Sequence, residues 1–162
     1  MNEPASLEAL CNEFFREFAR CEYCLKAVGL RDPNRRNPTA DWGAFAAQVQ
    51  AVFDAPPTIE VANAIQHYLT APPKKQVVEN GVLDWAPSVP DHANQAELVL
   101  RLICRVRNNL FHGGKFNGHW FEPERSEDLL RSGLCLLRAV VSAHPQVREA
   151  YEHRADTFRP LT

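Results

Sequence analysis

The sequence lacks a strong excess of charge of either sign. Its 162 residues include 18 lysines and arginines against 20 aspartates and glutamates, which gives a formal net charge of −2. Proteins that attract nucleic acid through their overall field carry a large positive charge. This chain has no such field, so any contact with RNA must use a local basic patch.

Long apolar runs are also absent. No stretch approaches the roughly 20 apolar residues that cross a bilayer. The N-terminal MNEPASLEAL contains neither a basic region nor an apolar signal core. We therefore expect a cytoplasmic protein that makes no membrane contact. The length and the hydrophobic content of 45% suit a single domain, residues 1–162, with a sizeable core.

The chain shows no clustered metal ligands and no disulfide framework. Its five cysteines are an odd number spread along expected helices: Cys11, Cys21, Cys24, Cys104 and Cys135. The CxxC at Cys21 and Cys24 has no second pair and no nearby histidine, so buried thiols are favoured over zinc or redox chemistry. The acids are dispersed and no two histidines have metal-ligand spacing. We therefore expect no metal and no cofactor.

Apolar residues at helical spacing predict a mainly helical chain. A first helix is expected from about Ser6 to Val28. Later helices are expected after N-caps at Asp41, Thr58, Asn94 and Ser126, and a short helical piece is expected within 146–159. The core face expected for the third helix consists of Ile59, Ala62, Ile65 and Leu69.

Residues 72–92, PPKKQVVENGVLDWAPSVPDH, are expected to form one long irregular insertion. Asn80-Gly81 between apolar pairs favours a small hairpin inside it. Lys74, Lys75 and Trp85 suit single-stranded RNA through charge and stacking, but packing of Trp85 onto the bundle is the favoured interpretation. The predicted fold is an all-α, up-and-down bundle of about five helices carrying this insertion.

The most informative stretch runs from Asn94 to Phe116, NQAELVLRLICRVRNNLFHGGKF. At about 100° per residue, one stripe about 60° wide forms the expected core face: Val99, Ile103, Val106 and Leu110. Asn94 with Glu97 has capping-box spacing, and Gly113-Gly114 is a strong helix stop. We expect one long amphipathic helix that ends in a polar cluster.

The polar residues of this helix leave two alternatives open. Arg105 and Asn108 lie within about 60° of His112 on a regular helix, whereas Arg107 lies about 140° from it. Arg107 and His112 of one chain would then point to different places. Either a second copy of the chain completes a site, or Arg105 is the partner of His112.

The run Arg107–His112, RNNLFH, resembles the motif of the HEPN superfamily, an arginine followed after four to six residues by a histidine. Arg107 matches the four-residue spacing and Arg105 the six-residue spacing. Asn108 matches the polar position after the arginine, which favours Arg107. The early stretch FFREFARCEYCLKAVG also resembles the first HEPN helix, and the resemblance is closest to small plasmid- or defence-associated members.

The resemblance implies a homodimeric, metal-independent endoribonuclease, often a toxin or a host-defence protein. We expect Arg107 to neutralise transition-state charge, His112 to transfer protons and Asn108 to orient the reacting groups. Supporting or RNA-binding roles are expected for Glu22, Lys26, Arg105, Asn109 and Lys115. An antitoxin or regulatory protein encoded elsewhere is a possible partner.

Two less specific interpretations compete with catalysis. Arg107 and His112 can instead bind carbonyls at the end of their helix, or an acid across the bundle. Some HEPN modules keep the fold but act only in RNA binding or in protein dimerisation. Cleavage of RNA, which requires the ribose 2′-hydroxyl, remains the preferred hypothesis.

Overall fold

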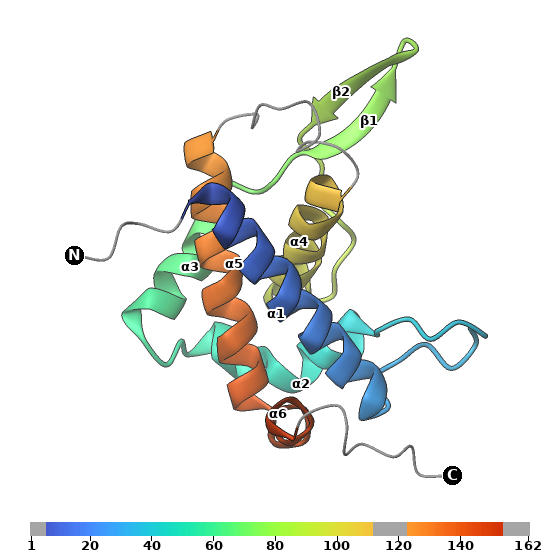
Figure 1. Cartoon of the computed structure of the whole chain (residues 1–162), viewed down its shortest axis with the longest axis vertical. Coiled ribbons are helices and arrows are strands. Elements are labelled where there is room, and N and C mark those ends of the chain that lie inside the picture. Colours follow the sequence, from blue (N-terminus) through green and yellow to red (C-terminus); the bar gives the residue numbers. More distant parts are fainter. Residues whose placement is uncertain (1–5, 112–122, 154–162) are drawn as a thin grey trace.

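The computed structural model describes residues 6–111 and 123–153, which form a mainly helical bundle (Figure 1). Its elements in order are α1 Leu7–Ala27, α2 Trp42–Asp54, α3 Ile59–Thr70, β1 Lys75–Glu79, β2 Val82–Ala86, α4 Gln95–Asn109, α5 Pro123–Ala143 and α6 Pro145–Glu152. α5 packs against α1, α3 and α6, and α4 packs against α2. The predicted mainly helical class is confirmed, with a small two-stranded sheet in addition.

Capping side chains set the starts of four helices, as predicted. Each accepts a hydrogen bond from a backbone N–H three residues ahead, and the caps are Ser6, Asp41, Thr58 and Asn94. The expected cap at Ser126 is wrong, because α5 already begins at Pro123. Proline has the backbone φ of a helix and needs no N–H partner in the first turn, so it can open a helix there.

The predicted core face of α3 is also wrong in part. Ile59 was expected inside but is 68% exposed, whereas Tyr68 is fully buried. The Tyr68 hydroxyl donates a hydrogen bond to the Leu129 carbonyl of α5 at 2.7 Å. The buried residues of α3 are Val61, Ala64, Ile65 and Tyr68. The face of α3 that packs against α5 therefore differs from the core face predicted by the spacing of its apolar residues.

The core of α4 agrees with the prediction. The expected stripe is buried throughout: Val99, Ile103, Val106 and Leu110. All five cysteines are free, and Cys11, Cys21 and Cys24 are buried. Burial raises the pKa of the Cys21 thiol far above its usual range. The CxxC therefore contributes apolar packing, as expected.

Gly133 of α5 lies directly against two buried aromatic side chains. A Cβ at this point of α5 would lie 2.8 Å from the ring of Phe14 and 2.8 Å from the Tyr68 hydroxyl. Alanine normally stabilises a helix interior by about 1 kcal/mol relative to glycine. We expect Gly133→Ala to lower the free energy of unfolding by about 1–3 kcal/mol instead, because both rings are buried and cannot move freely.

Urea denaturation followed by circular dichroism measures this change. Arg131→Ala on the exposed face of the same helix is the control. It removes only a solvent-exposed ion pair with Glu127 and should change stability by less than about 1 kcal/mol. A Gly133→Ala protein as stable as the parent would contradict the packing described.

The hairpin formed by β1 and β2 replaces much of the expected irregular insertion. Asn80 and Gly81 both have positive φ, 50° and 78°, as a type I′ turn requires. The register pairs Glu79 with Val82 and Lys75 with Ala86. Figure 1 shows the hairpin extending beyond the end of α4 and away from the helices. The hairpin expected around Asn80-Gly81 is thus present in the structure.

No helix in the described part of the chain is both long and apolar enough to cross a membrane.

Candidate functional site

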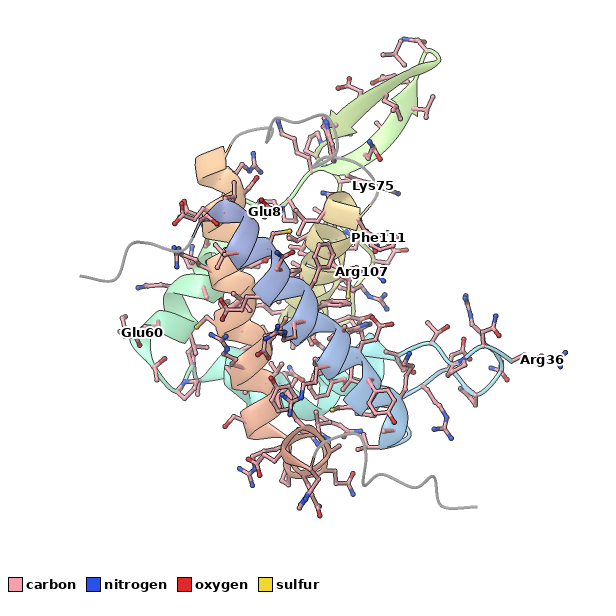
Figure 2. All side chains as sticks on the ribbon, viewed as in Figure 1. Glu8, Arg36, Glu60, Lys75, Arg107 and Phe111 are labelled. Carbon is pink, nitrogen blue, oxygen red and sulfur yellow. The ribbon has the colours of Figure 1, made fainter. Side chains whose placement is uncertain are left out.

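The candidate site lies where the last turns of α4 face α1 and the base of the hairpin. Figure 2 shows Lys75, Arg107 and Phe111 in this region. Arg105, Arg107, Asn108 and Asn109 are all described. The predicted proton-transfer residue His112 and the supporting residue Lys115 lie outside the described residues.

The end of α4 is not a regular helix. Its backbone widens into a π-type turn at Leu110 and Phe111. Such wide turns advance each residue by less than the usual 100°, and they occur frequently at functional sites. The separation of about 140° between Arg107 and position 112 assumed a regular helix. Residue 112 itself lies outside the described residues, so its direction relative to Arg107 stays a prediction.

Arg107 is held between two helices by aromatic rings. Its guanidinium carbon lies 5.8 Å from the centre of the Phe18 ring on α1 and 5.3 Å from that of Phe111. Its Nη1 donates a hydrogen bond of 2.9 Å to the side-chain oxygen of Asn108. Cation–π contacts of this kind restrict a guanidinium without neutralising it. Arg107 is therefore oriented while keeping most of its hydrogen-bond donors for a ligand.

Arg105 has a different environment. Its Nη1 donates to the carbonyl of Pro73 at 3.3 Å and also to the carbonyl of Ser88. Pro73 precedes β1 and Ser88 follows β2, so one side chain joins both ends of the hairpin to α4. Desolvation lowers the pKa of Arg105 from its ordinary value. These contacts give Arg105 a role in holding the hairpin.

Two further side chains bind the same backbone segment. Asn109 donates from Nδ2 to the carbonyl of Lys74 at 2.8 Å, and Arg125 of α5 donates to the carbonyl of Pro72 at 2.6 Å. The approach to β1 is therefore attached to both α4 and α5. Of the two candidate arginines, the structure leaves Arg107 better placed to receive a ligand.

A groove of about 600 Å³ lies beside Arg107. It is bounded by α1, the segment before α2, the hairpin base and α4. Its polar and aromatic lining includes Glu22, Trp42, Lys75, Gln76, Arg101, Arg105, Arg107, Asn108 and Asn109. Residues distant in the sequence thus meet at one solvent-open surface, and predicted site residues make up much of it.

The groove is locally basic although the chain is slightly acidic. Among the described residues, four cationic side chains and one acid, Glu22, line it; the cations are Lys75, Arg101, Arg105 and Arg107. Arg101 is paired with Glu97 at 2.5 Å. A hydrogen bond from the Ala93 N–H to Glu97, followed by the bond from Arg101, holds the pKa of the Glu97 carboxyl below its usual range. Arg107 therefore supplies the positive charge best placed to meet a phosphate.

Glu22 was expected to have a supporting or RNA-binding role. It lies on α1 and lines the same groove as Arg107. Both residues also line a second, more apolar groove of about 610 Å³, together with Lys26 and Phe111. Both side chains are described, and no ion pair joins them. In this structure Phe18 and Phe111, rather than Glu22, contact the guanidinium.

A thiol also lines the groove. Burial raises the pKa of Cys104 to about 12, so its thiol is neutral near physiological pH and is a poor nucleophile. Within residues 6–111 and 123–153, no group of three or more His, Cys, Asp or Glu side chains is arranged to hold a metal ion.

Sequence reasoning missed the aromatic support of the site. Phe18 was assigned to the core and is buried, but its ring also stacks on Trp42 at 5.3 Å and faces Arg107. The two rings come from α1 and α2, and the arginine comes from α4. No local pattern signals such a meeting, because it depends on how α1, α2 and α4 pack.

Comparison of the chain with protein-family models, with curated proteins and with solved structures finds no match. The function must therefore be argued from the groove and its residues.

Proposed function

We propose that this chain is a homodimeric, metal-independent endoribonuclease of the HEPN type. The observation that supports it most is the placement of Arg107. Its guanidinium is oriented by two rings at the edge of a basic groove, near the end of α4 and five residues before His112. Planar, permanently charged guanidinium groups suit phosphate recognition.

The proposed reaction transfers the phosphoryl group within the RNA. The ribose 2′-oxygen attacks the adjacent phosphorus and loses its proton to a base. The bond from phosphorus to the 5′-oxygen breaks, and that oxygen gains a proton from an acid. The products are a 2′,3′-cyclic phosphate and a 5′-hydroxyl. The reaction needs no oxidant and no other co-reactant.

Histidine is the side chain suited to both proton transfers near neutral pH. Arg107 stabilises the charge that develops on the phosphoryl oxygens, and Asn108, bonded to it, maintains its orientation. One chain provides a single histidine at position 112. A two-fold dimer would provide two, one as base and one as acid.

The remaining lining suits a single-stranded RNA. The groove cations can bind the phosphate backbone. The half-buried Trp42 in this groove and the exposed Phe111 in the neighbouring, more apolar groove offer rings for bases to stack on. We place the enzyme in the cytoplasm as a toxin or phage-defence effector. Its activity would then be controlled by an antitoxin or another regulatory protein.

Metal removal gives the direct test. We expect the purified protein to cut single-stranded RNA at an unchanged rate in excess EDTA. In the proposed mechanism His112 transfers protons and Arg107 stabilises the developing charge, so no step requires a metal ion. Gel analysis should show fragments that end in a cyclic phosphate. A DNA strand of the same sequence is the control and should stay intact, since it lacks the 2′-hydroxyl. Intact RNA with a retained gel shift would reject the nuclease in favour of an RNA-binding bundle.

A further inference from the structure

The hairpin exposes apolar side chains that the rest of the described chain does not cover. Val78 is 70% exposed and Leu83, its cross-strand neighbour, is 67% exposed. An isolated two-stranded hairpin is only marginally stable in water, and each of its edges carries unpaired backbone groups. The attachments through Arg105 and Asn109 hold only its base. These features point to a strand partner for the hairpin.

The register shows which backbone groups are free for pairing. The type I′ turn makes Glu79 and Val82 the hydrogen-bonded pair that closes the hairpin. Hydrogen-bonded and non-bonded pairs alternate along an antiparallel ladder. The N–H and C=O groups of Gln76 and Val78 therefore point away from β2, along the outer edge of β1.

The sequence of β1, KQVVE, is self-complementary in charge. We propose that β1 pairs antiparallel with β1 of a second copy of the chain, about a two-fold axis at Val77. In this arrangement Lys75 lies opposite Glu79 of the second copy, and Glu79 lies opposite its Lys75. Opposite charges at facing positions stabilise an antiparallel pair.

The same register satisfies the backbone. With the axis at Val77, Gln76 lies opposite Val78 of the second copy, so the outward groups of both strands meet. Lys75 and Glu79 then fall at non-hydrogen-bonded positions, where side chains approach most closely. Moving the axis to Gln76 or to Val78 removes both charge pairs. Only the Val77 register meets both requirements.

Pairing of β2 with β2 of a second copy is less favourable than pairing of β1 with β1. Its sequence, VLDWA, has Asp84 at the centre. A two-fold axis there would bring two aspartates together, and like charges at facing positions are destabilising. The β1 edge is therefore the one selected for pairing, and the product is a four-stranded antiparallel sheet.

The pairing has a consequence for the candidate site. Lys75 and Gln76 line the groove of Arg107, so the joined β1 strands would lie at the edge of the groove of each copy. The relevance of this position to RNA cleavage rests on the proposed function, whereas the pairing itself rests on the hairpin alone.

Charge reversal tests the pairing in the full-length protein. Sedimentation equilibrium should show a dimer for the parent. Lys75→Glu alone, or Glu79→Lys alone, should weaken dimerisation about tenfold, because each creates two like-charge contacts. The double variant should restore the parental dissociation constant. In one hairpin these two residues lie about 13 Å apart, so a rescue requires contact between chains.

A second pair of variants tests the edge. Val78→Pro removes an outward N–H from β1, and Leu83→Pro removes the equivalent N–H from β2; neither N–H belongs to the ladder within the hairpin. We expect the first to weaken the dimer and the second to leave it intact. The proposal would be overturned if the parent protein were monomeric at all concentrations. It would also be overturned if neither the charge reversals nor Val78→Pro changed the dissociation constant of the dimer.

The result is separable from the nuclease assay. Charge-dependent dimerisation without RNA cleavage would support the hairpin pairing and reject the enzyme. Cleavage by a dimer that is insensitive to the charge reversals would support the enzyme and reject the hairpin interface.

Discussion

His112→Ala should reduce the rate of RNA cleavage by at least about 10²- to 10⁴-fold, the range that general acid–base catalysis by one side chain contributes. In the proposed dimer the substitution removes both the base and the acid. Retention of RNA in a gel-shift assay should change little, because the groove cations remain. Cleavage rates under single-turnover conditions, with the dissociation constant measured separately, distinguish the two effects.

The matched control is His92→Ala. His92 is exposed near the start of α4, where its ring nitrogen lies 2.8 Å from the Pro90 carbonyl, and it does not line the groove of Arg107. We expect the His92→Ala protein to cleave RNA at the parental rate. Parental cleavage by His112→Ala would remove the histidine from the mechanism and, with it, the HEPN assignment.

Arg107→Ala should lower the single-turnover rate by about 10²- to 10³-fold, the usual cost of losing one donor that stabilises transition-state charge. The guanidinium faces Phe18 and Phe111 and is only half-buried. Its removal should therefore affect catalysis more than stability. Thermal denaturation of the same protein checks that the fold persists.

Arg107→Lys sharpens this test. Lysine keeps the charge but loses the planar pair of donors. An intermediate rate, at least about tenfold below the parent, is expected if Arg107 contacts the phosphate directly. Full activity with lysine would instead mean that only local charge matters.

Arg36→Ala provides the charge-matched control. Arg36 lies on the exposed loop between α1 and α2, far from Arg107 (Figure 2). The Arg36→Ala substitution alters the net charge by the same amount as Arg107→Ala. It should leave both the cleavage rate and the affinity for RNA close to those of the parent. An equal loss of cleavage in both variants would show a general electrostatic effect and would contradict a specific role for Arg107.

Features that depend on neighbours in the chain were predictable. The caps at Asp41 and Asn94 follow from side chains that bond backbone N–H groups three residues ahead. Asn80-Gly81 forms the expected turn because both residues accept positive φ. The buried stripe of α4 follows from its helical period. The polar cluster at 105–112 was found in the same way, from one continuous segment.

Features that depend on packing were not predictable. The buried face of α3 follows contact with α5, so Ile59 is exposed and Tyr68 is enclosed. Arg105 and Arg107 have the same chemistry and lie on one helix. Only the tertiary structure directs the first to the backbone of the hairpin and the second to the aromatic rings.

The sequence by itself determined four helix starts, the hairpin turn and the segment that carries the candidate chemistry, because each follows from local geometry or residue type. The tertiary structure decided which arginine faces the groove, which rings orient it and which face of α3 is buried. These depend on contacts between residues far apart in the chain, and a one-dimensional pattern does not record them.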